Sequence, residues 1–132
     1  MTTFACKVCG TSLTGDLVQL SDESLLHEKD GEPLLQPGTY FIETTGHPPA
    51  EAGDYLVSVE ALINTKQYLE AGGRLNGCCG LDGLDGINEL CINGHEVATV
   101  RTDCWLPSHA ILSPSVVSAQ RSAPADVVVP PV

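Results

Sequence analysis

The sequence predicts a mainly β or α+β fold in which a small antiparallel sheet carries one or two short helices. First, short apolar runs alternate with clusters of turn-forming residues, because 13 Gly and 9 Pro are spread through 132 positions. Second, Asn93-Gly94 stands between two apolar runs, which is the strongest short-range signal for a β-hairpin. Third, helical spacing of apolar residues is confined to two short segments.

Strands are expected where apolar, β-branched and aromatic residues cluster. These segments are residues 16–20, 40–44, 55–59, 88–92 and 95–101, with weaker candidates at 110–112 and 116–117. The Asn-Gly dipeptide predicts a two-residue type I′ turn between the segments 88–92 and 95–101. Such a turn pairs Cys91 with Glu96 and Leu90 with Val97, and it thereby fixes the register of the hairpin.

Two segments are candidates for helices. Ser21 or Asp22 can cap a short helix that runs through Lys29. Residues 60–71 place several apolar side chains near one face, and the Gly72-Gly73 pair ends the segment. We therefore expect one short helix before the central strands and a second one before the cysteine-rich block.

The domain organisation is simple. A chain of 132 residues corresponds to one domain. Residues 1–118 carry every expected element and all six cysteines, so they form the expected globular domain. Residues 119–132 consist mostly of Ala, Ser, Pro and Val, and we expect them to form a disordered tail.

The composition is acidic and limits the classes of partner. The 17 Asp and Glu outnumber the six Lys and Arg, which gives a formal net charge of −11. Proteins that bind nucleic acids neutralise phosphates with basic side chains, so this charge argues against a nucleic-acid partner. Anionic membrane surfaces are disfavoured for the same reason, whereas a basic protein partner is compatible with the charge.

The N-terminal sequence and the hydropathy indicate a cytoplasmic protein. The first residues lack the basic and apolar regions of a secretory signal peptide. No apolar run approaches the roughly 18 residues that a membrane-spanning helix needs. In a reducing compartment, six cysteines are interpreted as metal ligands, a redox site or buried residues rather than as a disulfide framework.

The cysteine pair near the N-terminus has the spacing of a metal-binding knuckle. In Cys6-Lys7-Val8-Cys9-Gly10, two thiolates can reach one cation, and the glycine permits the tight turn that follows. This segment resembles the zinc knuckle of rubredoxin-like and zinc-ribbon proteins, which implies half of a zinc-ribbon-like metal site. The second Cys-x-x-Cys knuckle of a zinc ribbon is absent from the sequence. Residues 78–105 also resemble a block in small bacterial proteins of unassigned function.

The expected metal is a structural Zn²⁺ closed by four thiolates, which leave no coordination position for water. The expected ligands are Cys6, Cys9, Cys79 and Cys104. In the predicted register, Cys104 lies about 26 Å along a straight strand from the residue opposite Cys91, so these two are not expected to share an ion. Cys79 is preferred to Cys78 because it precedes a glycine, as Cys9 does. The reserve ligands are Cys78, Cys91 and His109, and Cys91 is otherwise interpreted as an ordinary buried cysteine.

Three other kinds of thiol chemistry are compatible with the sequence. Cys104 and His109 are close enough in the chain to suggest a Cys-His hydrolase. The N-terminal Cys-x-x-Cys pair could serve as a dithiol redox site. The adjacent Cys78 and Cys79 would suit a metal-handling protein with exchangeable ligands.

The sequence also predicts where the side chains of Trp105 and His95 lie. Trp105 is the single tryptophan and directly follows a cysteine, so we expect it to cover the metal site or the core. Its alternative role is that of an interface anchor, since tryptophan is enriched among the residues that dominate binding energy. His95 follows the hairpin turn and is expected at the surface.

These features predict a small, acidic, zinc-stabilised binding or adaptor protein without catalytic activity. One alternative is a thiol-dependent enzyme, either a dithiol redox protein or a Cys-His hydrolase. Another is an inhibitor or immunity-type protein that covers a basic partner, which the small size and the negative charge would suit.

Overall fold

The computed structural model describes residues 1–68 and 75–121, and these form a mostly β protein with few helical residues. The described strands are β1 (Thr2–Cys6), β2 (Val18–Gln19), β3 (Thr39–Ile42), β4 (Tyr55–Val57), β5 (Thr65–Gln67), β6 (Glu89–Cys91), β7 (Glu96–Arg101), β8 (His109–Leu112) and β9 (Val117–Arg121). Two single-turn 3₁₀ helices, η1 (Glu23–Leu25) and η2 (Val59–Ala61), complete the described elements. The expected mainly β class is thus confirmed.

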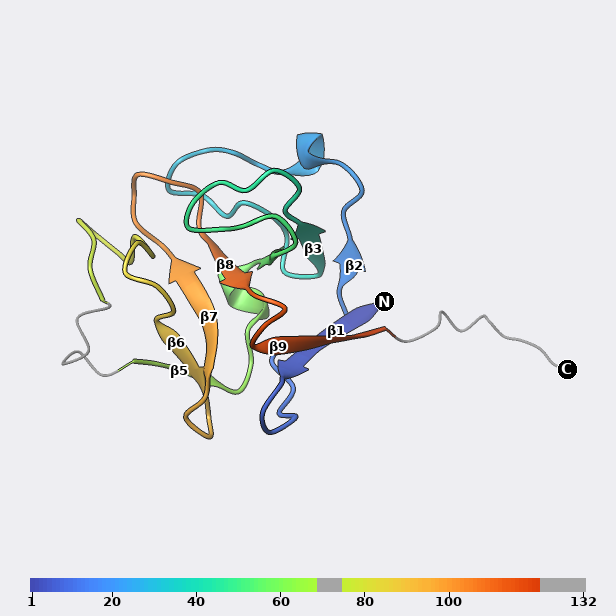
Figure 1. Cartoon of the computed structure of the whole chain (residues 1–132). Helices are drawn as coiled ribbons and strands as arrows, with labels where there is room; N and C mark the ends of the chain where they lie inside the picture. The colour runs from blue at the N-terminus through green and yellow to red at the C-terminus, as the bar shows by residue number, and fades with distance from the viewer. Residues whose placement is uncertain (69–74, 122–132) are drawn as a thin grey trace, which may run out of the picture.

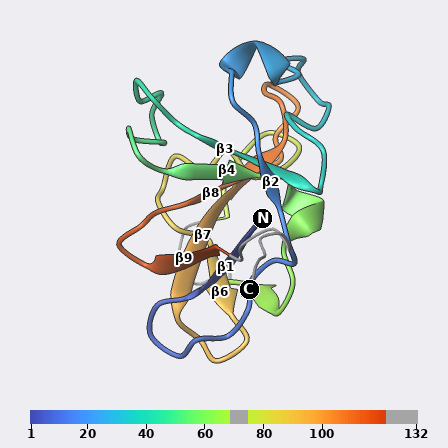
Figure 2. The same cartoon turned by 90° about the vertical axis from the view of Figure 1, so that its right-hand side faces the viewer.

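The strands form two sheets. Seven strands follow the order β2-β3-β4-β8-β7-β6-β5, and β1 and β9 form a separate antiparallel pair. Within the larger sheet only β2 and β3 are parallel, and the other neighbours are antiparallel. Figures 1 and 2 show the β1–β9 pair at the lower part of the molecule, beside the loop after β1 and the β6–β7 hairpin.

The larger sheet is covered on both faces, as the alternation of its side chains requires. Tyr40 of β3 and Val57 of β4 belong to the larger core cluster, which also contains Phe4 of β1. Phe41 of β3 and Leu56 of β4 point the other way, into a second cluster with Leu34, Leu35, Ala50 and Ile111. The β1–β9 pair covers the first face, where the Phe4 and Tyr40 rings meet edge to face with centroids 5.1 Å apart.

The predicted hairpin at Asn93-Gly94 is confirmed, but its register differs from the prediction. The loop has three residues, because the backbone N–H of Gly94 donates to the carbonyl of Cys91 at 2.8 Å and Gly94 has a φ of +91°. Only Gly94 takes the left-handed conformation, whereas a type I′ turn would require it of both central residues. Leu90 therefore pairs with Glu96 instead of Val97.

The helix expected over residues 60–71 is wrong for the part that the structure describes. Ser58 caps only the single turn of η2, and the chain then forms β5, which pairs with β6. Asn64 separates the two elements with a left-handed φ of 56°, which an α-helix cannot contain. The remaining positions, 69–71, lie outside the described residues.

The earlier helix candidate shrinks to one turn. The Asp22 side chain accepts a hydrogen bond of 3.0 Å from the backbone N–H of Ser24, so the expected N-cap is present. The helix ends after Leu25, and it contains no buried residue. Without an apolar face to pack against the sheet, nothing extends the helix to Lys29.

Strand β1 and the length of β9 differ from the sequence-based assignment. Strand β9 continues through Arg121, which pairs with Thr2, so residues 119–121 belong to a sheet rather than to a tail. This pairing holds β1 in place, and β1 in turn positions Cys6 at its end. Among residues 1–68 and 75–121, no helix has the length and apolar character needed to cross a membrane.

Candidate metal centre

The first half of the centre is the knuckle at the end of β1. Cys6 is the last residue of the strand, and its backbone N–H donates to the carbonyl of Thr11 at 2.8 Å. The chain then turns tightly, because the N–H of Gly10 donates back to the Cys6 carbonyl at 2.8 Å and Gly10 has a φ of +77°. The turn carries the exposed Cys9 thiol back toward the buried thiol of Cys6.

The second half comes from the β6–β7 hairpin and has a similar backbone. Cys91 ends β6, and its N–H donates to the carbonyl of His95 at 2.8 Å. The left-handed Gly94 closes this loop as Gly10 closes the first. The three-residue loop therefore brings His95 beside Cys91, with 3.4 Å between the Cys91 Sγ and the His95 Nδ1 atoms.

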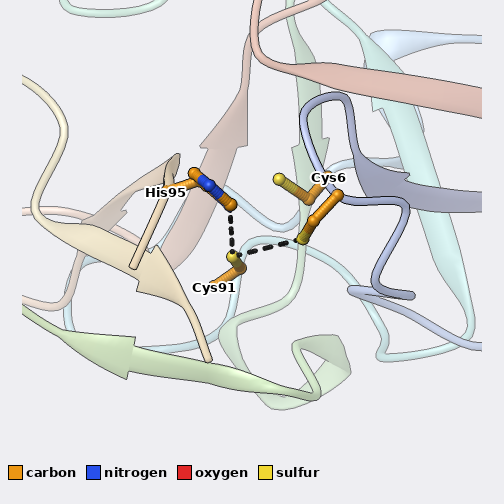
Figure 3. Close-up of side chains that lie close together, drawn as sticks. Cys6, Cys91 and His95 are labelled. Atoms are coloured by element: carbon orange, nitrogen blue, oxygen red, sulfur yellow. Dashed lines mark hydrogen bonds between the residues drawn. The ribbon is translucent and has the colours of Figure 1, made fainter. Parts of the chain in front are cut away.

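The two knuckles converge on one point. One ligand atom from each of Cys6, Cys9, Cys91 and His95 lies within 4.8 Å of the other three. The Sγ atoms of Cys9 and Cys91 are 3.8 Å apart, and this contact joins the two loops. Figure 3 shows Cys6, at the end of β1, together with Cys91 and His95 from the hairpin opposite. The cluster thus connects the two sheets of the protein.

Two of the separations within the cluster match those that a tetrahedral ion imposes on its ligands. Zn–S bonds of about 2.3 Å and a Zn–N bond of about 2.0 Å place two sulfur ligands about 3.8 Å apart, and a sulfur and a nitrogen about 3.5 Å apart. The corresponding distances here are 3.8 Å between Cys9 and Cys91 and 3.4 Å between Cys91 and His95. The four groups therefore form a possible site for one metal ion.

The electrostatics favour thiolate at the exposed end of the cluster. Hydrogen bonding from the Asn93 side chain, together with Thr11, lowers the pKa of Cys9 to about 5. The amide nitrogen of Asn93 lies 3.4 Å from the Cys9 Sγ atom and 3.2 Å from the Thr11 hydroxyl. Hydrogen bonding to Cys9, and then to Cys91, raises the pKa of His95. Thiolate sulfur and neutral imidazole are ligands for soft and borderline cations, and a bound metal would displace any proton that His95 holds.

The two buried thiols respond differently to their surroundings. Burial raises the pKa of Cys6. Burial also acts to raise the pKa of Cys91, but the backbone N–H groups of His95 and Asn93 outweigh it, and the pKa of Cys91 is lowered. Cys91 has no exposed surface. The backbone N–H groups therefore favour the thiolate form of Cys91 although the side chain is buried.

The predicted ligand set needs correction, because the structure divides it into two clusters. Cys6 and Cys9 lie in the cluster just described, whereas Cys79 and Cys104 lie together with Asp103 in another. Cys79 and Cys104 form a disulfide, with their Cα atoms 6.1 Å apart, although the sequence predicted no disulfides. The six residues of β7 separate the two clusters, and they span about 20 Å.

The Asp103 carboxylate organises the second cluster. It accepts hydrogen bonds from the backbone N–H groups of Cys78 at 3.0 Å, Cys79 at 3.2 Å and Cys104 at 2.7 Å. The Cys78 N–H, with those of Cys79 and Cys104, lowers the pKa of Asp103 despite burial. These bonds fix the loop that carries Cys79 against the end of β7, away from the N-terminal knuckle.

Sequence reasoning missed His95 and kept Cys91 only in reserve. The error follows from the assumed two-residue turn, which placed Cys91 opposite Glu96 rather than beside His95. The signal that was present is the spacing Cys91-x-x-Gly94-His95. Like the N-terminal knuckle, it combines a cysteine with a left-handed glycine, but here the glycine precedes the second ligand, which is an imidazole in place of a thiolate.

The remaining candidate residues lie elsewhere. Cys78 is a free, exposed thiol beside the disulfide. His109 is buried in β8 and is not part of either cysteine cluster. Trp105 is 70% exposed, so it covers neither the core nor the cluster around Cys6, and an interface role stays a prediction.

The cluster offers three sulfur atoms and one imidazole nitrogen to a metal ion. Four such ligands are the number found in structural zinc sites. Cys6 and Cys9 have the spacing of the knuckle, and the other half comes from a hairpin more than 80 residues further along the chain. In comparisons with known proteins, no family model, no curated protein and no solved structure matches the chain.

Proposed function

We propose that Cys6, Cys9, Cys91 and His95 bind one structural Zn²⁺, and that the chain is a zinc-stabilised binding or adaptor protein. The observation that carries the metal assignment is the convergence of the four ligand atoms within 4.8 Å of one another, with two of their separations matching tetrahedral coordination. Three thiolates and an imidazole favour zinc over harder ions such as Ca²⁺ or Mg²⁺, which prefer oxygen ligands. Four protein ligands leave no open position, and this supports a non-catalytic ion.

The role of the ion would be to join the two sheets. Strand β1 pairs with β9, is bridged to the segment that follows it at Thr2–Leu17 and Ala5–Ser12, and packs Phe4 in the core. The metal adds a bond from the end of β1 to the β6–β7 hairpin. Such a tether fixes the orientation of the two sheets and therefore the shape of the surface that a partner would meet.

The binding role is supported by charge and by the exposed apolar side chains. A net charge of −11 suits a basic protein partner and gives an association rate that falls as salt is added. Trp105 and Leu84 are both exposed, and they line one hollow beside the second cysteine cluster. Tryptophan is enriched among the residues that dominate binding energy at protein interfaces, and Arg101 and Asp82 line the same hollow.

The metal assignment is tested by replacing zinc with Co²⁺ and recording the absorption spectrum of each variant. The wild type is expected to bind one ion with the intense bands of tetrahedral thiolate coordination, and added azide should leave the spectrum unchanged. Cys91→Ser and His95→Asn should weaken or remove these bands, whereas Cys78→Ser should keep them. Retention of the bands in Cys91→Ser, or their loss in Cys79→Ser, would contradict the assignment.

The binding role needs a separate test. The immobilised, metal-loaded protein should retain basic proteins in a salt-sensitive manner, and the retained set should shrink for Trp105→Ala. The matched control is Val8→Ala, which removes a comparably exposed apolar side chain from the opposite end of β7. If the wild type and both variants retain the same proteins, the interaction is a general effect of charge and the binding role is wrong.

A second candidate function is thiol–disulfide exchange at Cys79–Cys104. The observation that favours it is the free, exposed thiol of Cys78 next to this disulfide. A dithiol reductant would supply two electrons and two protons, so that the S–S bond breaks, both cysteines become thiols and the reductant becomes a disulfide. The test is catalysis of insulin reduction by dithiothreitol, which Cys79→Ser should abolish and Cys9→Ser should not. An uncatalysed rate in the wild type would eliminate this function.

A further inference from the structure

A cavity of about 380 Å³ lies at the opposite end of β7 from the metal centre. Its apolar wall includes Leu34, Ala50 and Leu56 of the second core cluster. The loops that surround it follow η1, β3 and β7, and they gather at the upper end of the molecule in both Figures 1 and 2. This volume is within the range of sites that bind small organic molecules.

The first unusual group in the cavity is the carboxylate of Glu43, which is 6% exposed. Three hydrogen bonds reach its Oε2 atom: from the backbone of Gly46 at 3.0 Å, from His47 Nδ1 at 3.0 Å and from the Thr45 hydroxyl at 3.4 Å. Within residues 1–68 and 75–121, no hydrogen bond reaches Oε1. A buried carboxylate oxygen without a donor is costly, so this oxygen is available to accept a hydrogen bond from a molecule in the cavity.

The second unusual group is the imidazole of His109, which is 7% exposed and lines the same cavity. Its Nδ1 atom lies 2.8 Å from the carbonyl oxygen of Pro107. A carbonyl can only accept, so Nδ1 carries the proton and Nε2 is left as an acceptor. No described residue donates to Nε2. Burial lowers the pKa of His109 to about 4, so the ring is neutral at pH 7.

The charge around the cavity is negative. Among the described residues that line it, Glu23, Glu28 and Asp30 add to Glu43, and Arg101 is the one permanent cation. Arg101 donates its Nε–H to the carbonyl of Asp82 at 2.7 Å and flanks the cavity from β7. The field therefore favours a positively charged ligand over an anion.

A metal ion is a poorer match than an organic cation. Glu43, His47 and His109 do not form one of the described clusters whose ligand atoms lie close enough together for a single ion. An organic cation has separate N–H donors that can reach two acceptors some distance apart. Its hydrocarbon part can also cover the leucine side chains of the wall.

We propose that this cavity binds a small organic cation of the amine or amidine class, whose N–H groups donate to Glu43 Oε1 and His109 Nε2. The apolar part of the ligand packs against Leu34 and Leu56. The site is separate from the metal centre, because His109 pairs with Arg101 at the far end of β7 from His95.

The test compares benzamidine with benzamide, which has nearly the same shape and no charge. Both are titrated into the full-length protein as purified, and binding is followed by two-dimensional NMR. Benzamidine should bind saturably at one site, at least tenfold more tightly than benzamide, and the ¹⁵N resonance of His109 Nε2 should shift as it accepts a hydrogen bond. Equal affinities, or saturation without a change at Nε2, would overturn the proposal.

The matched variants are Glu43→Gln and Glu60→Gln, which remove the same charge inside and outside the cavity. Glu60 is exposed in η2 and does not line the cavity. Glu43→Gln should weaken benzamidine binding at least tenfold, and Glu60→Gln should leave it unchanged. Equal weakening in both variants would show a general effect of charge and would defeat the proposal. The Nε2 measurement on the wild type decides the question even if Glu43→Gln does not fold.

Discussion

The two ends of strand β7 carry different chemistry, although each presents cysteines and a histidine. At its start, Cys91 and His95 meet the N-terminal knuckle in a cluster with metal-like spacing. At its end, Cys79 and Cys104 are joined to each other, and the nearby His109 is buried and neutral. The same residue types thus form a candidate metal cluster at one end of β7 and a disulfide at the other end, about 20 Å away.

The difference lies in what surrounds the sulfur atoms. At the first end, side-chain and backbone N–H groups point at Cys9 and Cys91 and stabilise negative sulfur. At the second end, the backbone N–H groups point instead at the Asp103 carboxylate, which already supplies the negative charge. One of these groups, the Cys104 N–H, also reaches the Cys79 Sγ atom at 3.2 Å, but a thiolate there would lie 3.3 Å from an Asp103 carboxylate oxygen, so a neutral disulfide suits that end better.

Removing the metal should lower the free energy of unfolding more than any other change proposed here. It should disrupt the cluster around Cys91 and leave the Cys79–Cys104 disulfide intact. A ligand present at a thousand times its Kd stabilises the folded state by about 4 kcal/mol, so a chelator or Cys91→Ser should reduce the free energy of unfolding by about that amount. Denaturant unfolding followed by circular dichroism measures the change. Cys78→Ser is the control. An equal stability of Cys91→Ser and wild type would mean that no metal contributes to folding.

Opening the disulfide should be the second largest effect and should leave the metal in place. Cys79 and Cys104 are separated by 25 positions, and a crosslink over a loop of this length contributes about 3 kcal/mol through the unfolded chain. The double variant Cys79→Ser, Cys104→Ser should lose about this amount of unfolding free energy. Metal analysis of the same sample should still find one ion, and a sample without metal would show that the two clusters depend on each other.

His109, near the second end of β7, should make the free energy of unfolding decrease in acid. Its pKa is lowered to about 4 in the folded protein, against about 6.5 unfolded, so the unfolded chain binds the additional proton between these values. Stability is then full above pH 6.5 and falls as the pH is lowered to 4, by about 3 kcal/mol in all.

The measurement is the difference in this pH dependence between the wild type and His109→Gln. Metal loss and other carboxylates act in both proteins and cancel in the difference. The variant should therefore show a shallower decline between pH 6.5 and pH 4. Parallel curves would mean that His109 is accessible to protons in the folded state.

Much of the fold could be predicted from the sequence because its signals are local. The period-two runs around Phe41 and Leu56 and the Asn93-Gly94 turn identified strands and a hairpin that the structure contains. The short helical segment failed because strand pairing with β6 decides the conformation of residues 65–67. Strand β1 was missed for a similar reason, since its partner β9 lies at the other end of the described chain.

The candidate metal centre was only half predictable. The spacing of Cys6 and Cys9 is a local property, and both residues lie in the cluster. Whether Cys91 or Cys104 joins this cluster depended on the length of the hairpin loop. A loop of three residues, rather than the expected two, brings His95 beside Cys91. The cavity site was not predictable at all, since Glu43 follows β3 and His109 begins β8, and these two strands are not sheet neighbours.

The smallest expected effect concerns Asn93, which distinguishes the first end from the second without supplying a ligand. Its amide donates to Cys9 and to Thr11, and it is the main cause of the lowered pKa of Cys9. Groups that orient and charge a ligand in this way typically change metal affinity by 10- to 100-fold. Asn93→Ala should therefore weaken Zn²⁺ binding by about tenfold in a competition titration with a chelator of known affinity.

Asn76→Ala is the matched control, because the Asn76 amide donates to Asp85 on the loop of the second cluster. Equal affinities of the two variants would mean that metal affinity depends on the four ligands alone, and that the hydrogen bonds around the thiolates are not what separates the two ends of β7.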